Sequence, residues 1–354
     1  MSNHKFPYEW TLKDAQFTKD KGNVFSCFAC GGGSTMGYKL AGFNVIGCNE
    51  IDPKMIEAYR TNHNPQFSYL EPIQTFKDRE DLPDELFNLD ILDGSPPCSS
   101  FSMAGNREKD WGKEKKFREG QADQVLDTLF FDFIDLAKRL KPKVVIAENV
   151  KGLLLGDAQK YVNAILIAFD EAGYYVDFKL LDASKMGVPQ RRERVFFFAI
   201  RKDLYTGPFS DLFSTRPYLD LEFNEDPIYF SDIYQPGIDD RPCSKGKMYD
   251  YWSKRIQSDK SFEHTIKREW NETRCFSNVY LHQDDICCTY TSNSDVIYLY
   301  DEYRRPNLYE SCCIGSYPQD YNFCKSKYNY IIGMSVPPVM TAQIATSVYE
   351  QWLM

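Results

Sequence analysis

A single cysteine follows a short apolar stretch, in a setting that suits a nucleophile. The run Ile91-Leu92 predicts a strand, and Gly94-Ser95 predicts the turn after it. The pair Pro96-Pro97 then restricts the backbone, so Cys98 leaves the strand end on a stiff segment. Ligands of open α/β sheets bind beyond the carboxyl ends of strands, where a cysteine is a candidate nucleophile. The alternative is a small buried hydrophobic residue, the common state of free cysteines.

A carboxylate is expected at the same edge of the sheet. The apolar run 144–147 predicts a buried strand, and Glu148 follows it directly. Because parallel strands present their carboxyl ends at one edge, Glu148 is expected near Cys98.

Two arginines stand just before another predicted strand, at 195–200. Residues two apart in an extended chain share a face, so Arg192 and Arg194 should point the same way. We expect both to face the cleft beside the carboxylate, with Arg191 and Glu193 pointing away. The arginines would then provide the positive surroundings that lower the pKa of a reactive thiol.

A glycine-rich turn follows the first strong strand, predicted at 24–29. The turn Cys30–Gly37 leads toward a helix, and a second strand at 43–48 ends near Glu50. Strand, glycine turn and helix bring backbone N–H groups close to a ligand, and an acid about 20 residues later can bind a ribose. This pattern favours a nucleoside-containing cofactor. The alternative is an ordinary βα turn with an exposed glutamate.

Composition narrows the class of protein. The chain has 354 residues, 43% of them hydrophobic, with no apolar run of 18 residues and no basic-plus-apolar leader. We therefore expect no membrane span, no membrane partner and an intracellular (cytoplasmic) location. The 11 cysteines show no disulfide spacing, and Cys27-x-x-Cys30 has no second pair, so no metal is expected. The net charge of −9 argues against a generally basic nucleic-acid binder but allows a local basic cleft.

Alternating strands and helices over 24–200 predict an α/β fold with a doubly wound, mostly parallel sheet. Residues 1–22 are expected to be an extension with a short helix, and 339–353 an amphipathic helix. From about 202 the periodicity weakens, and bases mix with aromatics in 245–274, which suits nucleic-acid contact or a mixed surface. The expected helices are 38–41, 53–62, 124–140 and 157–172, and the remaining expected strands are 67–70 and 174–181.

Taken in their order along the chain, these motifs resemble those of the DNA (cytosine-5) methyltransferases of the bacterial or phage type. The resemblance covers about 24–200 and 289–354. The matching stretches are Phe28-x-Cys30-x-Gly32-Gly33 with Gly37 and Ala41-Gly42-Phe43, Glu50-Ile51-Asp52, Pro96-Pro97-Cys98-x-x-Phe101-Ser102, Glu148-Asn149-Val150, Gln190-x-Arg192-x-Arg194, and Gly333-x-Ser335-Val336-Pro337-Pro338.

The resemblance implies a Rossmann-like S-adenosylmethionine-dependent methyltransferase fold with a smaller, irregular, partly β target-recognition domain. It implies a catalytic and cofactor-binding domain at 1–201, the recognition domain at 202–325, and a C-terminal segment at 326–354 that returns to the first. The implied catalytic residues are Cys98, Glu148, Arg192 and Arg194, and the implied cofactor-binding residues are Phe28, Gly32, Gly33, Glu50, Ile51, Pro96, Ser335 and Val336.

The implied reaction transfers a methyl group from S-adenosylmethionine to C5 of a flipped-out cytosine in double-stranded DNA, by a monomer without a metal. Cys98 would attack C6, Glu148 would protonate N3, and Arg192 would hold the ring carbonyl and orient Glu148. The loop 99–120 would close over the base.

Several positions depart from the family pattern. Cys30 stands where a glycine is usual, Ser26 where an aspartate is common, Ser99 where a glutamine is usual and Met334 where an asparagine is usual. The acid that would contact the adenine has no clear match, although Glu71 is adjacent. These substitutions at the cofactor site could weaken S-adenosylmethionine binding.

Three other functions fit parts of the pattern. A transfer-RNA cytosine-5 methyltransferase has the same motifs, although a separate recognition region favours DNA. A catalytically inactive DNA-binding regulator is disfavoured by the intact Cys98 and Glu148. A small-molecule methyltransferase would have little use for an additional recognition domain.

Overall fold

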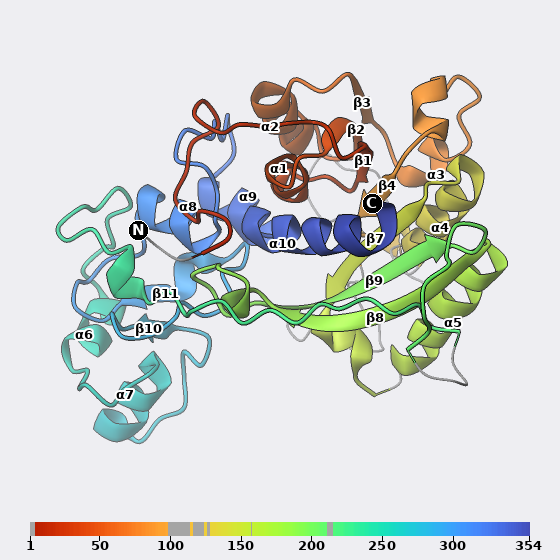
Figure 1. Cartoon of the computed structure of the whole chain (residues 1–354). Coiled ribbons are helices and arrows are strands. Elements are labelled where there is room, and N and C mark those ends of the chain that lie inside the picture. Colours follow the sequence, from red (N-terminus) through yellow and green to blue (C-terminus); the bar gives the residue numbers. More distant parts are fainter. Residues whose placement is uncertain (1–3, 98–113, 116–123, 126–127, 157, 211–214) are drawn as a thin grey trace.

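The protein is built on a seven-stranded sheet (Figure 1). The computed structural model describes residues 4–97, 114–115, 124–125, 128–156, 158–210 and 215–354. The strand order is β3-β2-β1-β4-β7-β9-β8. The strands are β1 (Asn23–Cys27), β2 (Asn44–Glu50), β3 (Phe67–Leu70), β4 (Ile91–Gly94), β7 (Val144–Val150), β8 (Tyr174–Asp182) and β9 (Glu193–Arg201).

The first five strands in this spatial order, β3-β2-β1-β4-β7, pair in parallel. Strand β9 runs antiparallel to both of its neighbours, β7 and β8. The predicted doubly wound, mostly parallel sheet is therefore confirmed. Two short sheets are separate from it. One pairs β5 (Glu114–Lys115) with β6 (Gln124–Val125), and the other pairs β10 (Val279–Leu281) with β11 (Ile297–Leu299).

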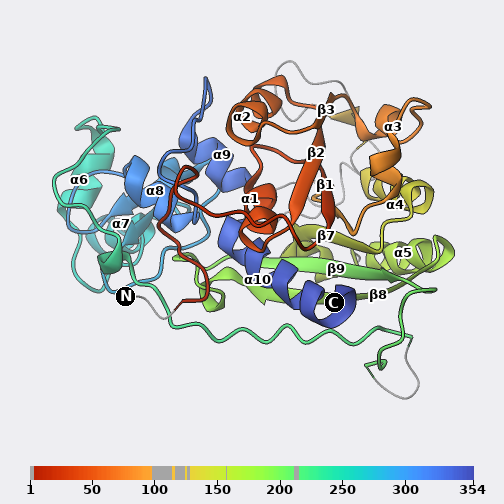
Figure 2. The ribbon, with the colours of Figure 1, turned by 45° about the horizontal axis from the view of Figure 1, so that its top comes forward.

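Helices cover both faces of the large sheet (Figure 2). Side chains that alternate along the strands divide between two cores, since Phe25 and Leu92 pack with α4 and α5 while Val24 and Ile91 pack with α10. Both faces are buried, which explains why the strands are continuous apolar runs. The α-helices are α1 (Gly33–Leu40), α2 (Pro53–His63), α3 (Ile73–Phe76), α4 (Leu129–Leu140), α5 (Ala158–Glu171), α6 (Lys247–Ser253), α7 (Phe262–Trp270), α8 (Leu308–Ile314), α9 (Tyr328–Met334) and α10 (Pro338–Val348).

Shorter turns of helix connect these elements. The 3₁₀ segments are η1 (Asp84–Phe87), η4 (Lys151–Leu154), η5 (Ala183–Lys185), η6 (Phe230–Asp232) and η7 (Ser294–Val296), and a π-helical turn, η8 (Tyr349–Leu353), follows α10.

Helix α10 differs from the prediction for 339–353. It is not amphipathic, because every residue from Pro338 to Thr346 is buried. The helix packs beside α1 on the same face of the sheet and shares its core with the strands, so almost all of its side chains are covered (Figures 1 and 2). The helical stretch Tyr328–Leu353 is long and apolar enough to cross a membrane, but 89% of its most apolar window is buried inside the protein.

Three other predicted helices were wrong in their bounds or existence. The helix predicted at 124–140 begins at Leu129, because Gln124–Val125 pair with Glu114–Lys115 as a strand. Helix α1 starts at Gly33 and not at 38, because the glycine turn itself begins the helix. Residues 4–22 form no helix. They contain bends and one turn at 12–14. Trp10 attaches them to the C-terminal part of the chain: its indole N–H donates to the Ser316 carbonyl at 2.9 Å, and its own carbonyl accepts from the Gln319 N–H.

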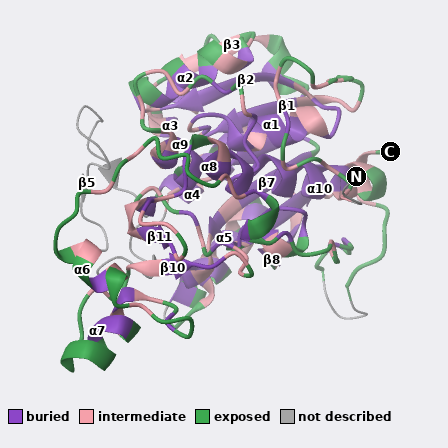
Figure 3. Ribbon diagram, turned by 90° about the vertical axis from the view of Figure 1, so that its left-hand side faces the viewer, coloured by how far each residue is buried: buried purple, intermediate pink, exposed green. Residues whose placement is uncertain are grey.

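Residues after β9 first follow the large sheet and then build a separate lobe. Leu219 and Leu221 pack in the same core as α10, and Figures 1 and 2 show this green segment running alongside β8. The lobe contains α6, α7, β10 and β11, around a small aromatic core that includes Phe262 and Tyr280. Figure 3 shows α6 and α7 projecting from the buried body of the sheet. The domain boundaries at 201/202 and 325/326 stay predictions.

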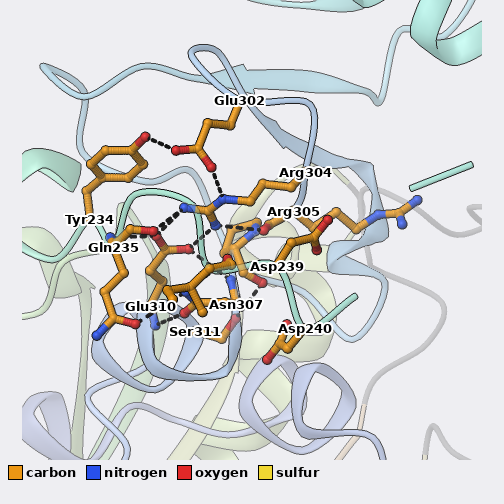
Figure 4. A network of polar contacts seen from close by, with 12 residues as sticks. Tyr234, Gln235, Asp239, Asp240, Glu302, Arg304, Arg305, Asn307, Glu310 and Ser311 are labelled. Atoms are coloured by element: carbon orange, nitrogen blue, oxygen red, sulfur yellow. Dashed lines mark hydrogen bonds and ion pairs between the residues drawn. The ribbon is translucent and has the colours of Figure 1, made fainter. Parts of the chain in front are cut away.

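A buried ion pair joins the lobe to the helices beside it (Figure 4). The Arg304 guanidinium donates to both carboxylate oxygens of Glu310, at 2.7 and 2.9 Å, and both side chains are almost fully buried. Arg304 also donates to Glu302 at 2.6 Å and to the Gln235 carbonyl at 2.7 Å. Glu310 in turn accepts from the backbone N–H groups of Gln235 and Asn307, both at 2.9 Å. One cation therefore connects three separate segments of the chain.

This ion pair leads to a prediction about stability. Arg304→Met should lower the free energy of unfolding by about 3–5 kcal/mol, because it leaves the Glu310 carboxylate buried and unpaired. Lys151→Met is the control: Lys151 and Glu193 form a half-exposed pair at 2.7 Å, whose loss should cost about 1 kcal/mol or less. Urea denaturation measures both. Equal losses would contradict the role assigned to Arg304.

Candidate active site

A pocket lies at the carboxyl ends of the parallel strands β1, β2, β3 and β4, where α/β sheets bind ligands. Residues from α9 close one side of it, although they are more than 200 positions from the strands along the chain. The lining residues are Phe28, Cys30, Asn49, Glu50, Ile51, Asp52, Met55, Glu71, Ile73, Ser95, Pro97, Tyr330 and Met334. Three of them are acidic and none is basic, so the pocket favours a ligand with positive charge.

The Glu50 carboxylate connects two of the segments that line the pocket, namely the turn after β1 and the end of β2. One carboxylate oxygen accepts from the Cys30 N–H at 2.7 Å, and the other accepts from the N–H groups of Ile51 and Asp52 at 2.8 Å each. Burial raises the pKa of Glu50, and these backbone bonds oppose that rise. The carboxylate thus joins the turn after β1 to the end of β2, and Glu50 is itself part of the pocket lining.

The turn after β1 has an unusual backbone. Phe28 and Cys30 have φ values of +54° and +49°, and Gly32 has +85°. This left-handed conformation costs a residue with a side chain roughly 1–2 kcal/mol, so the usual glycine at position 30 of the family pattern has a physical reason. Burial raises the pKa of the Cys30 thiol to about 12, with the Glu50 charge adding to the effect. Cys30 is therefore a neutral thiol in the pocket wall.

Five of the eight residues expected to bind a cofactor do not line the pocket: Gly32, Gly33, Pro96, Ser335 and Val336. Three of them, Gly33, Ser335 and Val336, pack against one another. A side chain at Gly33 would overlap Ser335 and the Val336 carbonyl, so this glycine allows α1 to approach the segment before α10. The Ser335 hydroxyl donates to the Ile331 carbonyl at 2.8 Å and accepts from the Tyr317 hydroxyl at 2.6 Å. The other three, Phe28, Glu50 and Ile51, line the pocket directly.

Glu148 forms an ion pair with Arg194. The Arg194 Nε lies 3.0 Å from the Glu148 Oε1, and the side chains are 16% and 14% exposed. They come from the adjacent antiparallel strands β9 and β7. Next to Glu148, the Asn149 side-chain amide donates to the Pro96 carbonyl at 3.1 Å, which ties the end of β7 to the segment after β4.

Arg192 does not contact Glu148, contrary to our expectation. It is 3% exposed, and its guanidinium donates to the backbone carbonyls of Tyr290 and Gly333 at 3.1–3.3 Å. Burial, with Arg194 nearby, lowers the pKa of Arg192 to about 9. The predicted alternation is confirmed, since Arg191 and Glu193 are exposed. Arg192 precedes β9, where two segments remote in sequence cover it, and only Arg194 extends to the carboxylate.

Cys98 lies outside the described residues, as does most of the loop 99–120, so the predictions for both stay predictions. The described chain before Cys98 ends at Pro97, which lines the pocket. Among the described residues, no group of three or more His, Cys, Asp or Glu side chains is arranged to hold a metal.

Sequence reasoning missed several pocket residues. Met55 and Ile73 lie within a few residues of strand ends, and this position could have identified them. Glu71 was considered only as an imperfect match to the adenine-side acid, and it does line the pocket. Its carboxylate accepts from Arg79 at 2.9 Å. Tyr330 had no signal in the sequence, because only the packing of α9 brings it to the strand ends.

A family model described as C-5 cytosine-specific DNA methylase matches residues 22–350. The chain belongs to this family. Among relatives, the type II methyltransferase M.FnuDI of Fusobacterium nucleatum is 38% identical over 186 residues, which is 52% of this chain and 49% of the relative. The type II methyltransferase M.Eco47II of Escherichia coli is 32% identical over 264 residues, 70% of this chain and 58% of the relative. The chain spans about half the length of the first of these relatives.

Two solved structures have the same fold as this protein. A putative DNA modification methyltransferase encoded within an Escherichia coli prophage has a TM-score of 0.64 at 22% identity, over 94% of this chain and 99% of that chain. A DNMT2 variant of Spodoptera frugiperda has a TM-score of 0.62 at 16% identity, over 92% and 99%. These likenesses, together with the family, establish the Rossmann-like methyltransferase fold.

The position of Arg192 gives a second prediction about stability. Arg192→Ala should lower the free energy of unfolding by about 3 kcal/mol, because buried carbonyls lose charged donors worth about 1.5–3 kcal/mol each. Arg191→Ala, one residue away and exposed, should change it by about 0.5 kcal/mol or less. Chemical denaturation of both variants measures the difference, and similar values would mean that the buried guanidinium stabilises nothing.

Proposed function

We propose that this protein is a DNA (cytosine-5)-methyltransferase that transfers a methyl group from S-adenosylmethionine to a flipped-out cytosine in double-stranded DNA. The observation that carries the proposal is the Glu148–Arg194 pair, at the same edge of the sheet as a pocket whose wall includes Pro97. Cys98 is the next residue along the chain. A carboxyl group and a cation thus lie at the edge of the sheet to which the chain leads the candidate nucleophile, and the pocket lies at the same edge.

The pocket residues fit S-adenosylmethionine. Its sulfonium and ammonium groups are cationic, and Glu50, Asp52 and Glu71 make the lining acidic. The apolar side chains of Phe28 and Ile51 would contact the adenine, and the Glu50 carboxylate would accept hydrogen bonds from the ribose hydroxyls. When bound, this cofactor supplies an electrophilic methyl group. Cys30 and Met334, which depart from the family pattern, both line the pocket.

The protein's own residues would then make cytosine C5 reactive. A base inside a duplex is inaccessible, so it must be flipped out. The Cys98 thiolate forms a bond to C6, and the electron pair that this displaces makes C5 nucleophilic. Glu148, when protonated, donates to N3 and relieves the charge on the ring. After C5 has taken the methyl group, loss of the C5 proton to a base expels Cys98 and restores the ring.

Arg194 takes the orienting role that we had expected of Arg192. Its ion pair with Glu148 fixes the orientation of that carboxyl group. Its positive charge favours the thiolate form of Cys98. Arg192 instead supports the site indirectly. Its guanidinium donates to the carbonyl of Gly333, which lies two residues before Ser335.

The lobe around α6 and α7 is the proposed target-recognition region, within 202–325. Residues 245–274 contain eight Lys or Arg and five Asp or Glu, in a chain with a net charge of −9. Exposed aromatics accompany these bases, with Trp270 43% and Phe276 79% exposed. This combination suits a nucleic-acid backbone and its bases. The type II relatives support sequence-specific methylation, and we expect a monomer that acts inside the cell without a metal.

A transfer-RNA substrate is the alternative. Incorporation of tritium from labelled S-adenosylmethionine into duplex DNA, and not into transfer RNA, is the expected result; the reverse would overturn the DNA assignment. Sequencing of bisulfite-treated DNA from expressing cells would then give the recognition sequence. A catalytically inactive regulator is the second alternative, and it predicts no covalent complex with 5-fluorocytosine DNA, where we expect one.

The chemistry gives a third prediction. Glu148→Gln should slow methyl transfer by about two to four orders of magnitude, because the amide cannot donate a proton to N3. Cys98→Ser should abolish transfer and the covalent complex, since a hydroxyl is far less nucleophilic than a thiolate. Single-turnover assays measure the rates, and gel-shift assays check that DNA binding persists. A Glu148→Gln rate within about twofold of the parent rate would make Glu148 merely structural.

A fourth prediction separates the two arginines. Arg194→Ala should slow transfer by roughly 10- to 150-fold, the equivalent of one charged hydrogen bond, and it should also lower stability, because both side chains are mostly buried and Glu148 loses its partner. Arg191→Ala is the control and should retain the parent rate. Rates are measured per folded molecule, with circular dichroism to count the folded fraction. If Arg192→Ala slows methyl transfer by the folded enzyme while Arg194→Ala does not, then Arg192 and not Arg194 orients Glu148.

A further inference from the structure

We propose that Asp93 is a positioning residue that clasps both ends of the turn after β1 and connects this turn to the strand that leads to Cys98. The inference rests on the proposed function only in naming S-adenosylmethionine as the ligand of that turn. Asp93 does not line the pocket and lies five positions before Cys98, so it would act through other residues.

Three hydroxyl groups converge on the Asp93 carboxylate. The hydroxyls of Ser26 and Ser34 donate to its Oδ2 at 2.6 and 2.7 Å, and the Tyr38 hydroxyl donates to its Oδ1 at 3.1 Å. Ser26 belongs to β1 and is directly opposite Asp93 in the parallel pairing of β1 with β4. Ser34 and Tyr38 belong to α1. One side chain therefore joins a strand, a neighbouring strand and a helix.

The two serines flank the strained turn. Between Ser26 and Ser34 lie the left-handed residues Phe28 and Cys30, which line the pocket. A backbone in this conformation persists only where its surroundings fix it. Glu50 fixes the middle of the turn through the Cys30 N–H, and Asp93 fixes both of its ends.

Without such a role, the buried Asp93 carboxylate would only lower the stability of the protein. Asp93 is 5% exposed, and no lysine or arginine of the described residues forms an ion pair with it. Burial raises its pKa to about 6, although the three hydroxyls oppose that rise and Glu148 adds to it. An isolated buried carboxylate costs stability unless its hydrogen bonds compensate. A role in shaping the turn explains why a carboxylate, and not an apolar residue, occupies this strand position.

Asp90 provides a matched control on the same two strands. Its carboxylate accepts from the Asn23 N–H at 2.7 Å and pairs with Lys143 at 2.7 Å, so it also joins β1 and β4. Asp90 stands at the opposite ends of these strands from the pocket. If Asp93 served the fold alone, Asp93→Ser and Asp90→Ser would have the same consequences.

The first experiment compares the two variants. Calorimetric titration with S-adenosylmethionine should give about 10-fold weaker binding, or worse, for Asp93→Ser, and an affinity within about twofold of the parent for Asp90→Ser. Hydrogen exchange without any ligand should show faster exchange of the amides at 28–36 in Asp93→Ser only. Parent-like binding and exchange in Asp93→Ser would overturn the proposal. A parent protein that binds no S-adenosylmethionine would overturn the proposed cofactor, and the exchange comparison would still test the clasp.

The second experiment moves the carboxylate across the strand pair. Ser26 and Asp93 are register partners, and the Ser26 and Ser34 hydroxyls lie 3.5 Å apart. The double variant Ser26→Asp/Asp93→Ser should therefore keep a carboxylate within reach of Ser34 and regain affinity to within about threefold of the parent. Recovery supports the clasp even if Asp93→Ser alone fails to fold. A double variant as weak as Asp93→Ser, or equally unable to fold, would overturn it.

Discussion

Parallel strands that are covered on both faces leave only their ends for chemistry, and this constraint organises the whole protein. Helices α4 and α5 bury one face of the sheet while α1 and α10 bury the other. The polar groups that could act on a ligand therefore collect where β1, β2, β4 and β7 stop. Each of these ends needs its own polar support, because the backbone there has left the sheet and its N–H and carbonyl groups require partners.

Carboxylates supply much of that support. Glu50 accepts three backbone N–H groups, and Glu310 holds a buried arginine at the junction with the smaller lobe. Arg192 does the converse, since it is a cation that satisfies backbone carbonyls from two remote segments. The region thus uses charged side chains as substitutes for regular backbone pairing. Such groups fix geometry more than they add stability, since each must first be removed from water.

The sequence was sufficient to predict the sheet, because buried parallel strands are distinct apolar runs separated by helical periodicity. It also predicted that Arg192 and Arg194 share a face, since alternation is a local property of a strand. It did not predict which arginine contacts Glu148. That depends on the antiparallel register of β9 against β7 and on the carbonyls of Tyr290 and Gly333, about 100 and 140 residues away. For the same reason Gly33 was expected to approach a ligand, whereas it packs against Ser335.

The wall of the pocket contributed by α9 has a consequence for synthesis on the ribosome. Tyr330 and Met334 are translated after the entire sheet, and so is α10, which covers one of its faces. Until those residues emerge, a nascent chain can pair its strands but leaves Val24 and Ile91 facing water, on a surface prone to association. The recess also lacks a side during that time. Ligand binding and escape from aggregation should therefore begin together, only after Met334 and α10 have been synthesised, and both should depend on how quickly that segment docks.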